Sequence, residues 1–260
     1  MQKKPLVSIL IANYNSSQYI QHCINSLSTQ TYKNLEIIFF DDNSSDNSID
    51  IINQFSNVKV IENKIQTKFG SLNQLNAFKE AVKISKGDLI FLLDSDDYFN
   101  KEKIEKVVNY FNNNKNAKIV FDYPLIVENN NIYSEKTKVR FFKTYWPYIH
   151  PTSCISVKKN CFEELLKVIS YKDFTDVWLD LRICLFSKYI LKDFHIINEN
   201  LTFYRKTTSN ISSKFSKFSK NWWKRRMQAH QYFQKFSRDN ELNFNKNFDF
   251  LITKLICKFL

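Results

Sequence analysis

The chain has 260 residues, of which 43% are hydrophobic and only two are glycine, and its formal net charge is +12. Because Gly70 and Gly87 lie far apart, the sequence excludes the glycine-rich phosphate loops of Rossmann and P-loop proteins, as well as collagen-like chains and Gly/Ser linkers. The five cysteines are odd in number and form no C-x-x-C pair, which argues against a zinc site or a disulfide framework and favours reduced thiols in a cytosolic protein. No apolar stretch predicts a membrane span or a signal peptide.

Apolar runs and amphipathic segments alternate along the first hundred residues. Strands are predicted at residues 6–11, 35–40, 58–61 and 89–93, and helices between them over about 17–27, 45–55 and 72–86. Gly87 then has the place of a helix C′ residue. The later order is looser: helices are predicted near 101–113, 160–168 and 175–188, strands near 118–122 and 195–204, and a hairpin-like region to about 142. This alternation with short connections predicts an α/β fold, with a mainly parallel sheet flanked by helices.

Polar residues follow three of the predicted strands. They are Asn13-Tyr14-Asn15, Asp41-Asp42 and Asp94-Ser95-Asp96-Asp97. In an open parallel sheet, ligands bind outside the carboxyl ends of the strands, so these residues are expected to meet at one edge. Asp94 and Asp96 lie two residues apart, and strand alternation lets both carboxylates point the same way. Paired acids are costly without a compensating cation or ribose hydroxyls, and Mg²⁺ or Mn²⁺ with substrate phosphates is the natural partner.

Four motifs, in order and spacing, are similar to those of family 2 glycosyltransferases. They are VSILIANYN from Val7 with STQTY from Ser28, LEIIFFDDNSSD from Leu35, the segment from Gly70 to Asn76 with Lys86-Gly87-Asp88, and LLDSDD from Leu92. The resemblance covers about residues 5–210. It implies a GT-A fold and inverting transfer of a sugar from a nucleotide-sugar, commonly a UDP-sugar, with a divalent metal ion. Residues 1–211 are then expected to form the GT-A domain, and residues 212–260 a basic, aromatic, helical C-terminal extension.

The resemblance assigns a set of residues to the nucleotide-sugar donor. The set is Ala12, Tyr14, Asn15, Asp42, Asn76, Asp94, Ser95, Asp96 and Arg205. Tyr14 would stack on the base, Asp42 would hydrogen-bond the edge of the base, and Asp94 would meet the ribose. Asp96 would ligate the Mn²⁺ or Mg²⁺ ion that bridges the diphosphate, and Arg205 would contact the phosphates.

The general base is expected later in the chain, because inverting transfer needs one carboxylate to take the proton from the acceptor hydroxyl. The segment FTDVWLDLR is similar to the family's Glu-Asp helix start, which makes Asp176 the expected base, with Thr175 in place of the glutamate. The alternative for Asp176 is an acid that interacts with the helix dipole, and Asp180 is the second candidate for the base. His150 and Thr152, with Asp180, stand where such enzymes line the acceptor cleft, and a structural hydrogen bond is the alternative for His150.

The positive charge is concentrated at the C-terminal end, where residues 201–260 hold 13 Lys and Arg against 3 Asp and Glu. Two helices are predicted there, near 220–237 and 246–259. The second has an apolar stripe flanked by lysines, formed by Phe248, Leu251, Ile252, Leu255, Ile256 and Phe259. Cations interleaved with aromatic residues over 214–260 suit an anionic membrane surface. One alternative is a helix pair packed on the body or in a homodimer, and another is a nucleic-acid site.

Together these features predict a metal-dependent inverting glycosyltransferase, cytoplasmic and peripheral on the inner face of the cytoplasmic membrane. Its acceptor would be a glycan or a lipid-linked sugar in bacterial surface polysaccharide or lipo-oligosaccharide synthesis. A nucleotidyltransferase that makes the sugar nucleotide is one alternative, but Asn13-Tyr14-Asn15-Ser16-Ser17 stands where such an enzyme usually has a glycine-rich, basic loop. The other alternative is a nucleic-acid-binding protein that acts through the basic tail.

Overall fold

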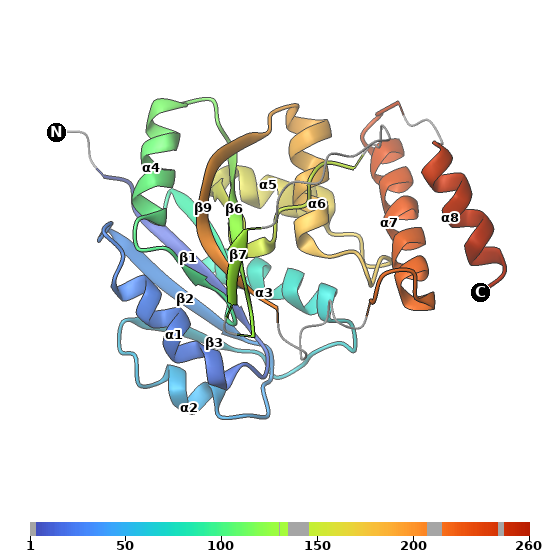
Figure 1. Ribbon diagram of the computed structural model, residues 1–260. Helices are drawn as coiled ribbons and strands as arrows, with labels where there is room; N and C mark the ends of the chain where they lie inside the picture. The colour runs from blue at the N-terminus through green and yellow to red at the C-terminus, as the bar shows by residue number, and fades with distance from the viewer. Residues whose placement is uncertain (1–3, 130, 135–145, 207–214, 244–246) are drawn as a thin grey trace.

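The computed structural model describes residues 4–129, 131–134, 146–206, 215–243 and 247–260. Its strands are β1 (Val7–Asn13), β2 (Leu35–Asp41), β3 (Val58–Glu62), β4 (Leu89–Asp94), β5 (Tyr98–Phe99), β6 (Ile119–Glu128), β7 (Asn131–Ser134), β8 (Ile155–Lys158) and β9 (His195–Arg205). Its helices are α1 (Ser17–Ser28), α2 (Ser48–Ile52), α3 (Gly70–Ile84), α4 (Lys103–Asn113), α5 (Lys159–Ile169), α6 (Leu179–Phe186), α7 (Lys220–Asp239) and α8 (Phe248–Lys258). Figure 1 shows the helices arranged around one central sheet.

The strand order along the sheet is β3-β2-β1-β4-β8-β6-β9-β5, with β7 paired to β6. Strands β3, β2, β1 and β4 run parallel, whereas β8 is antiparallel to both β4 and β6. In this register Ala12 lies between Phe40 and Asp94, and Asn13 lies beside Asp41. The polar residues at the ends of the three strands therefore meet at one edge of the sheet, as predicted.

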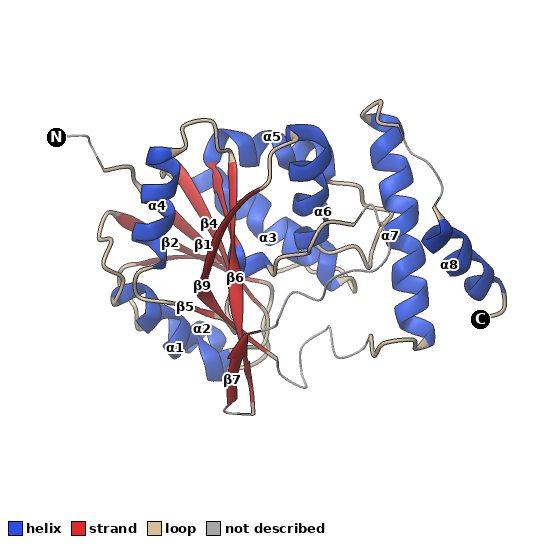
Figure 2. Ribbon diagram, turned by 45° about the horizontal axis from the view of Figure 1, so that its top comes forward, coloured by secondary structure: helices blue, strands red, loops and turns tan. Residues whose placement is uncertain are grey.

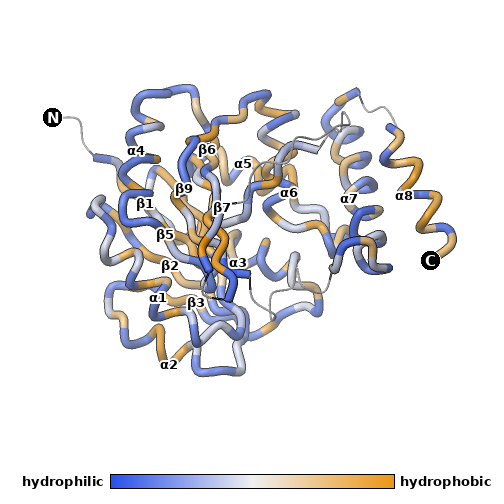
Figure 3. Tube along the Cα trace, viewed as in Figure 1, coloured by the Kyte–Doolittle hydropathy of each residue, from blue (hydrophilic) through white to orange (hydrophobic). Residues whose placement is uncertain are grey.

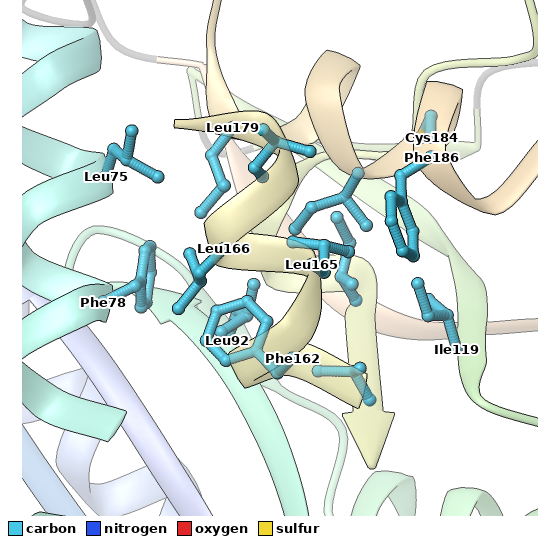
Figure 4. Packing of buried hydrophobic residues seen from close by; sticks show 14 of the residues in the cluster. Leu75, Phe78, Leu92, Ile119, Phe162, Leu165, Leu166, Leu179, Cys184 and Phe186 are labelled. Atoms are coloured by element: carbon cyan, nitrogen blue, oxygen red, sulfur yellow. The ribbon is translucent and has the colours of Figure 1, made fainter. Parts of the chain in front are cut away.

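Successive side chains of the strands point to opposite faces of the sheet and pack into two hydrophobic layers, one on each face. Ile9 and Ile11 of β1 pack with α1, α2 and α4, whereas Leu10 between them packs with α3, α5 and α6. The same alternation separates Leu92 from Leu93 in β4. Figure 4 shows the second layer, where side chains of α3, α5 and α6 meet over β4. Both faces of β1 and β4, and of the second half of β2, are buried, which explains why their sequences are continuous apolar runs.

Two helices begin later than predicted, because side chains hold the preceding residues in turns. Asp46 accepts hydrogen bonds from the main-chain N–H of Ser17 at 2.9 Å and of Ser48 at 3.0 Å, so α2 begins only at Ser48. Arg182 donates to carbonyl oxygens of the segment before α6, which forms a loop where a helix was predicted. The predicted hairpin is the β6–β7 pair, and residues 135–142 lie outside the described residues.

Gly87 does not have the role that its place after a helix predicted. Helix α3 ends at Ile84, and Gly87 does not have a positive φ. A Cβ atom at this position would lie 2.5 Å from Ser8 Oγ, 2.6 Å from the main-chain N of Ser8 and 2.8 Å from the carbonyl oxygen of Leu6. Position 87 requires glycine because the main chain just before β4 lies directly against the start of β1, which leaves no room for a side chain.

The basic tail forms the two predicted helices, and α7 packs on the body. Tyr232, Phe233 and Phe236 of α7 belong to the same hydrophobic cluster as α5 and α6. Helix α8 then packs on α7 through Phe250 and Thr253, and Figure 2 shows it as the outermost element. Within the described part of the chain, every helix is too short or too polar to cross a bilayer.

Candidate active site

A cleft of about 990 Å³ opens at the edge of the sheet where the polar residues meet. Its walls come from the ends of β1 and β4, the start of α3, the segments before β8 and α6, and α7. The predicted site residues that line it are Ala12, Tyr14, Asn15, Asp42, Asp94, Ser95, Asp96, Thr152, Asp176 and Asp180. Ligand pockets commonly measure about 300–1,000 Å³, so this cleft is large enough for a nucleotide carrying a sugar.

Tyr14 and Asp42 lie at the end of the cleft beside β1 and β2. The ring of Tyr14 is half exposed, and Asn15 after it has a left-handed backbone with φ of 49°. Asp42 accepts a hydrogen bond from Asn63 Nδ2 at 2.7 Å, and burial raises the pKa of its carboxyl. An open aromatic face beside a hydrogen-bond acceptor is an arrangement that can hold a nucleotide base.

The three acids at the end of β4 have different surroundings. Asp97 is fully buried and accepts hydrogen bonds from Ser153 Oγ at 2.6 Å and from the main-chain N–H of Arg205 at 2.8 Å, so it stabilises the turn. Asp94 and Asp96 line the cleft instead. Burial, with a smaller contribution from the charge of Asp96, raises the pKa of Asp94 to about 7. Burial also raises the pKa of Asp96 to about 6.

These two carboxylates fit a divalent cation. Neighbouring buried acids repel each other unless a cation compensates them, and Mg²⁺ and Mn²⁺ take carboxylate oxygens together with substrate phosphates and water. In the described ranges, no three His, Cys, Asp or Glu side chains converge to form a complete protein cage. An ion held by Asp96 would therefore complete its coordination with oxygen atoms from phosphates and water.

Arg205 lies behind Asp96 and is not part of the cleft wall. Its guanidinium donates to the carbonyl oxygen of Asp96 at 2.5 Å. The same group lies over the rings of Tyr19 and Tyr98, at 5.0 and 4.6 Å from their centroids. Arg205 thus stabilises the turn that carries the acids, and the cation that β9 brings to the cleft wall is the next residue, Lys206.

A buried ion pair lies beneath the acids and was not predicted. Lys103 Nζ lies 2.7 Å from Asp122 Oδ2, and both side chains are almost completely buried. Lys103 also donates to the carbonyl oxygen of Ser153 at 2.7 Å and to Thr202 Oγ1 at 2.5 Å. Ser153 Oγ in turn accepts the main-chain N–H of Asp94 at 3.0 Å. The charge pair therefore fixes the residue that orients the acids, and its partners are too far apart in sequence for spacing to show it.

Asn76 and His150 lie away from the cleft. The residues of α3 that line the cleft are Asn73 and Gln74, and Gln74 Nε2 donates to Asp94 Oδ1 at 2.9 Å. His150 is completely buried, and its Nδ1 lies 2.8 Å from a main-chain oxygen of β6. Burial lowers the pKa of its imidazole to about 4, so the ring is neutral. This is the structural hydrogen bond that was the alternative for His150.

Asp176 and Asp180 face the cleft from the segment before α6 and from its first turn. Burial raises the pKa of the Asp180 carboxyl. Trp178, Phe215 and Arg225 line the cleft too, and the guanidinium of Arg225 lies 4.8 Å from the ring centroid of Phe215. Carboxylates that can take a proton from a hydroxyl lie here among aromatic faces on which a sugar ring can pack. Phe215 and Arg225 belong to the basic tail and had not been predicted in the site.

The sequence as a whole matches one family model. The model of glycosyl transferase family 2 matches residues 8–253. The chain belongs to this family. The match takes in the strand-end acids, both candidates for the base and α7.

Relatives of this chain include UDP-Glc:alpha-D-GlcNAc-diphosphoundecaprenol beta-1,3-glucosyltransferase WfaP of Escherichia coli. This chain is 39% identical to it over 131 residues, which are 50% of this chain and 47% of the relative. The chain thus spans about half the length of that protein.

Solved structures with the same fold include the following two. TarS 1–349 of S. aureus in complex with UDP-GlcNAc superposes with a TM-score of 0.62 at 16% identity, over 97% of this chain and 70% of that one. The mannosyltransferase PcManGT of Pyrobaculum calidifontis, in complex with GDP-Man and Mn²⁺, gives a TM-score of 0.60 at 14% identity, over 98% and 70%. These likenesses confirm the predicted GT-A fold.

Proposed function

We propose that this family 2 chain transfers a sugar from a UDP-sugar, with inversion, to a glycan or lipid-linked acceptor in the synthesis of a bacterial surface polysaccharide or lipo-oligosaccharide. One observation carries the proposal: Tyr14, Asp42, Asp94, Asp96 and Asp176 line a single cleft. The named substrates of the E. coli relative, a UDP-glucose donor and a diphosphoundecaprenol-linked sugar, support it. So does the UDP-GlcNAc bound to TarS.

The donor would lie along the ends of β1 and β4. Tyr14 stacks on the base, Asp42 accepts a hydrogen bond from the edge of the base, and Asp94 accepts hydrogen bonds from the ribose hydroxyls. Asp96 would hold Mn²⁺ or Mg²⁺ against the diphosphate. A divalent ion bound there supplies positive charge where the leaving group becomes negative. The Mn²⁺ in the PcManGT complex supports this use of a metal.

Asp176 would act as the general base. Its carboxylate takes the proton of the acceptor hydroxyl while the hydroxyl oxygen forms a bond to the anomeric carbon of the donor sugar. The bond from that carbon to the diphosphate oxygen breaks on the opposite face, UDP leaves, and the configuration is inverted. Asp180, in the first turn of α6, is the second candidate for the base.

The exposed apolar face of α8 and the basic residues around it would hold the chain on the inner face of the cytoplasmic membrane, close to a lipid-linked acceptor. The alternatives of a nucleotidyltransferase and of a nucleic-acid-binding protein are less favoured, because the family model extends through α7.

A screen of nucleotide-sugars tests the proposal, with UDP release and UDP binding measured in Mn²⁺ and in EDTA. The wild type should release UDP from at least one UDP-sugar and bind UDP only with the metal. Asp96→Ala should lose both properties. Asp176→Asn should bind UDP normally but turn over about 10²–10⁴ times more slowly, the usual contribution of a general base.

Asp173→Asn is the matched control, because this exposed acid lies three residues before Asp176 and outside the cleft wall. It should behave as the wild type. Retention of metal-dependent UDP binding and turnover by Asp96→Ala would remove the central claim. Full turnover by Asp176→Asn would transfer the role of base to Asp180.

A further inference from the structure

Helix α7 reaches the loop that carries Asp176. The main-chain N–H of Asp176 donates to Gln228 Oε1 at 2.9 Å, and Gln228 Nε2 donates to Asp176 Oδ2 at 3.1 Å. These partners determine the amide orientation, because the N–H of Asp176 requires an acceptor and its carboxylate requires a donor. One side chain of the tail thus binds both the backbone and the carboxylate of the proposed base.

The rest of this loop is held by groups that do not touch the carboxylate. Arg182 is completely buried and donates to four carbonyl oxygens, those of Ile169, Tyr171, Phe174 and Val177, at 2.6 to 3.0 Å. Its guanidinium also lies 5.1 Å from the ring centroid of Tyr232 on α7. Ser71 of α3 donates to the carbonyl oxygen of Thr175. These contacts fix where the loop lies, but the direction of the Asp176 carboxylate is left to Gln228.

Among the described residues, Gln228 is the one side chain that hydrogen-bonds the Asp176 carboxylate. Its amide occupies Oδ2, which leaves Oδ1 for the proton of the acceptor. A base is effective only when its carboxylate is held at the reacting hydroxyl, and a displacement of about 1 Å can cost about a hundredfold in rate. An amide serves this purpose well, because it orients the carboxylate without competing with it for the proton.

We propose that Gln228 of α7 is the positioning residue for the base Asp176, so that the tail helix completes the active site. The inference rests on the proposed function, in which Asp176 takes the acceptor proton. Gln228 does not line the cleft, and it acts by holding the carboxylate in one orientation.

The test compares Gln228→Met with Gln231→Met in the full 260-residue chain. Methionine keeps the length of glutamine but removes both hydrogen bonds, and Gln231 is an exposed residue of the same helix. With Mn²⁺ and the UDP-sugar that the wild type turns over, Gln228→Met should lower kcat about 10- to 100-fold, while KM for the donor, the affinity for UDP and Tm stay close to the wild type. Gln231→Met should match the wild type.

A double-mutant cycle separates positioning from a general effect on the fold. In an Asp176→Asn background, Gln228→Met should cause no further loss of kcat, because the carboxylate that it orients is gone. An equal loss in both backgrounds, or a full-rate Gln228→Met, would overturn the inference while leaving the proposed function intact. A wild type that turns over no nucleotide-sugar would overturn both. Should Gln228→Met fail to fold, Gln228→Glu replaces it, because it keeps the acceptor for the Asp176 N–H and repels the carboxylate; a full-rate Gln228→Glu would equally overturn the inference.

Discussion

Arg182 and His150 show two ways of burying a basic side chain in this molecule. Arg182 keeps its charge, because four carbonyl oxygens and the face of an aromatic ring surround its guanidinium. His150 has one main-chain acceptor for Nδ1 and no hydrogen-bond partner among the described residues for Nε2, so the neutral ring is the stable form. The difference has a consequence for stability against pH.

The free energy of unfolding should fall as the pH falls from about 6.5 to about 4, in part because of His150. Its pKa is about 4 in the folded chain and 6.5 in the unfolded chain, so the unfolded state takes up the proton first. At pH 5 the protonation of His150 alone should lower the free energy of unfolding by about 2 kcal/mol relative to pH 7, since each pKa unit corresponds to about 1.4 kcal/mol. Asn at position 150 keeps the donor but cannot titrate.

Urea unfolding of the wild type and of His150→Asn, at pH 5 and pH 7, measures this contribution. The wild type should lose about 2 kcal/mol more than the variant between the two pH values. Subtracting the change in the variant from the change in the wild type removes the contribution of the carboxyl groups that titrate in the same pH range, because both proteins contain them. An equal loss in both would show that the folded chain accommodates a charged imidazole at this position.

At the residue scale, the sequence predicted those positions that strand register determines. Asp94 and Asp96 could be placed in the cleft because they come at the end of an apolar strand and alternate along it. Asn76 was misplaced because motif matching does not give the rotation of a helix. The rotation of α3 turns Asn73 and Gln74 toward the cleft, and Gln74 reaches Asp94. Gln228 carried no local signal, since its partner lies 52 residues earlier in the chain.

At the scale of elements, α8 has two apolar sides, and only one is covered. Phe250 and Thr253 are buried against α7, whereas Leu251, Leu255 and Phe259 are 53%, 60% and 80% exposed. Figure 3 shows the apolar character of this helix at the edge of the molecule. The spacing of the apolar residues in the sequence correctly predicted an amphipathic helix here. Spacing alone does not tell which side of a helix is covered by the rest of the protein. Exposed leucines and phenylalanines beside lysines have the chemistry of an interfacial helix.

The outer face of α8 should bind vesicles that contain phosphatidylglycerol more strongly than vesicles of phosphatidylcholine alone. Leu251→Glu with Leu255→Glu should lower binding to the anionic vesicles about tenfold or more, because it removes apolar burial and adds like charge to the lipid. Ile84→Glu, at an exposed position at the end of α3, is the matched control. Co-sedimentation with the vesicles measures the binding of the wild type, the double variant and the control. Undiminished binding by the double variant would assign the α8 face to another partner, with a homodimer as the next to test.

At the scale of the whole molecule, α7 packs into the core of the body, although it belongs to the basic tail by sequence. Its aromatic residues Tyr232, Phe233 and Phe236 are each less than 5% exposed within the core cluster. The alternation of strands and helices was enough to predict the layers of the first hundred residues. The sequence offered packing of the tail helices on the body only as an alternative, because the charges of α7 dominate its composition; the structure shows that α7 does pack there.

Two truncations should therefore behave differently. A chain that ends at residue 212 loses three buried aromatic side chains, each worth about 1.5–3 kcal/mol, and such a loss approaches the whole stability of a typical domain. We expect it to aggregate or to unfold without cooperativity. A chain that ends at residue 243 keeps α7 and should unfold cooperatively, as measured by circular dichroism and size-exclusion chromatography. A well-folded chain of 212 residues would show that α7 contributes little to the core.

The contact between Gln228 and Asp176 also constrains how proteins of this type can diverge. A recombination event that joined this body to a foreign C-terminal part before α7 would discard Gln228, which hydrogen-bonds the proposed base Asp176, even if the new part folded well. A junction after Asp239 would keep every residue of the proposed active site and would allow α8 to be replaced. Variation between related chains is therefore expected to concentrate beyond α7, where a new surface can be acquired without rebuilding the chemistry.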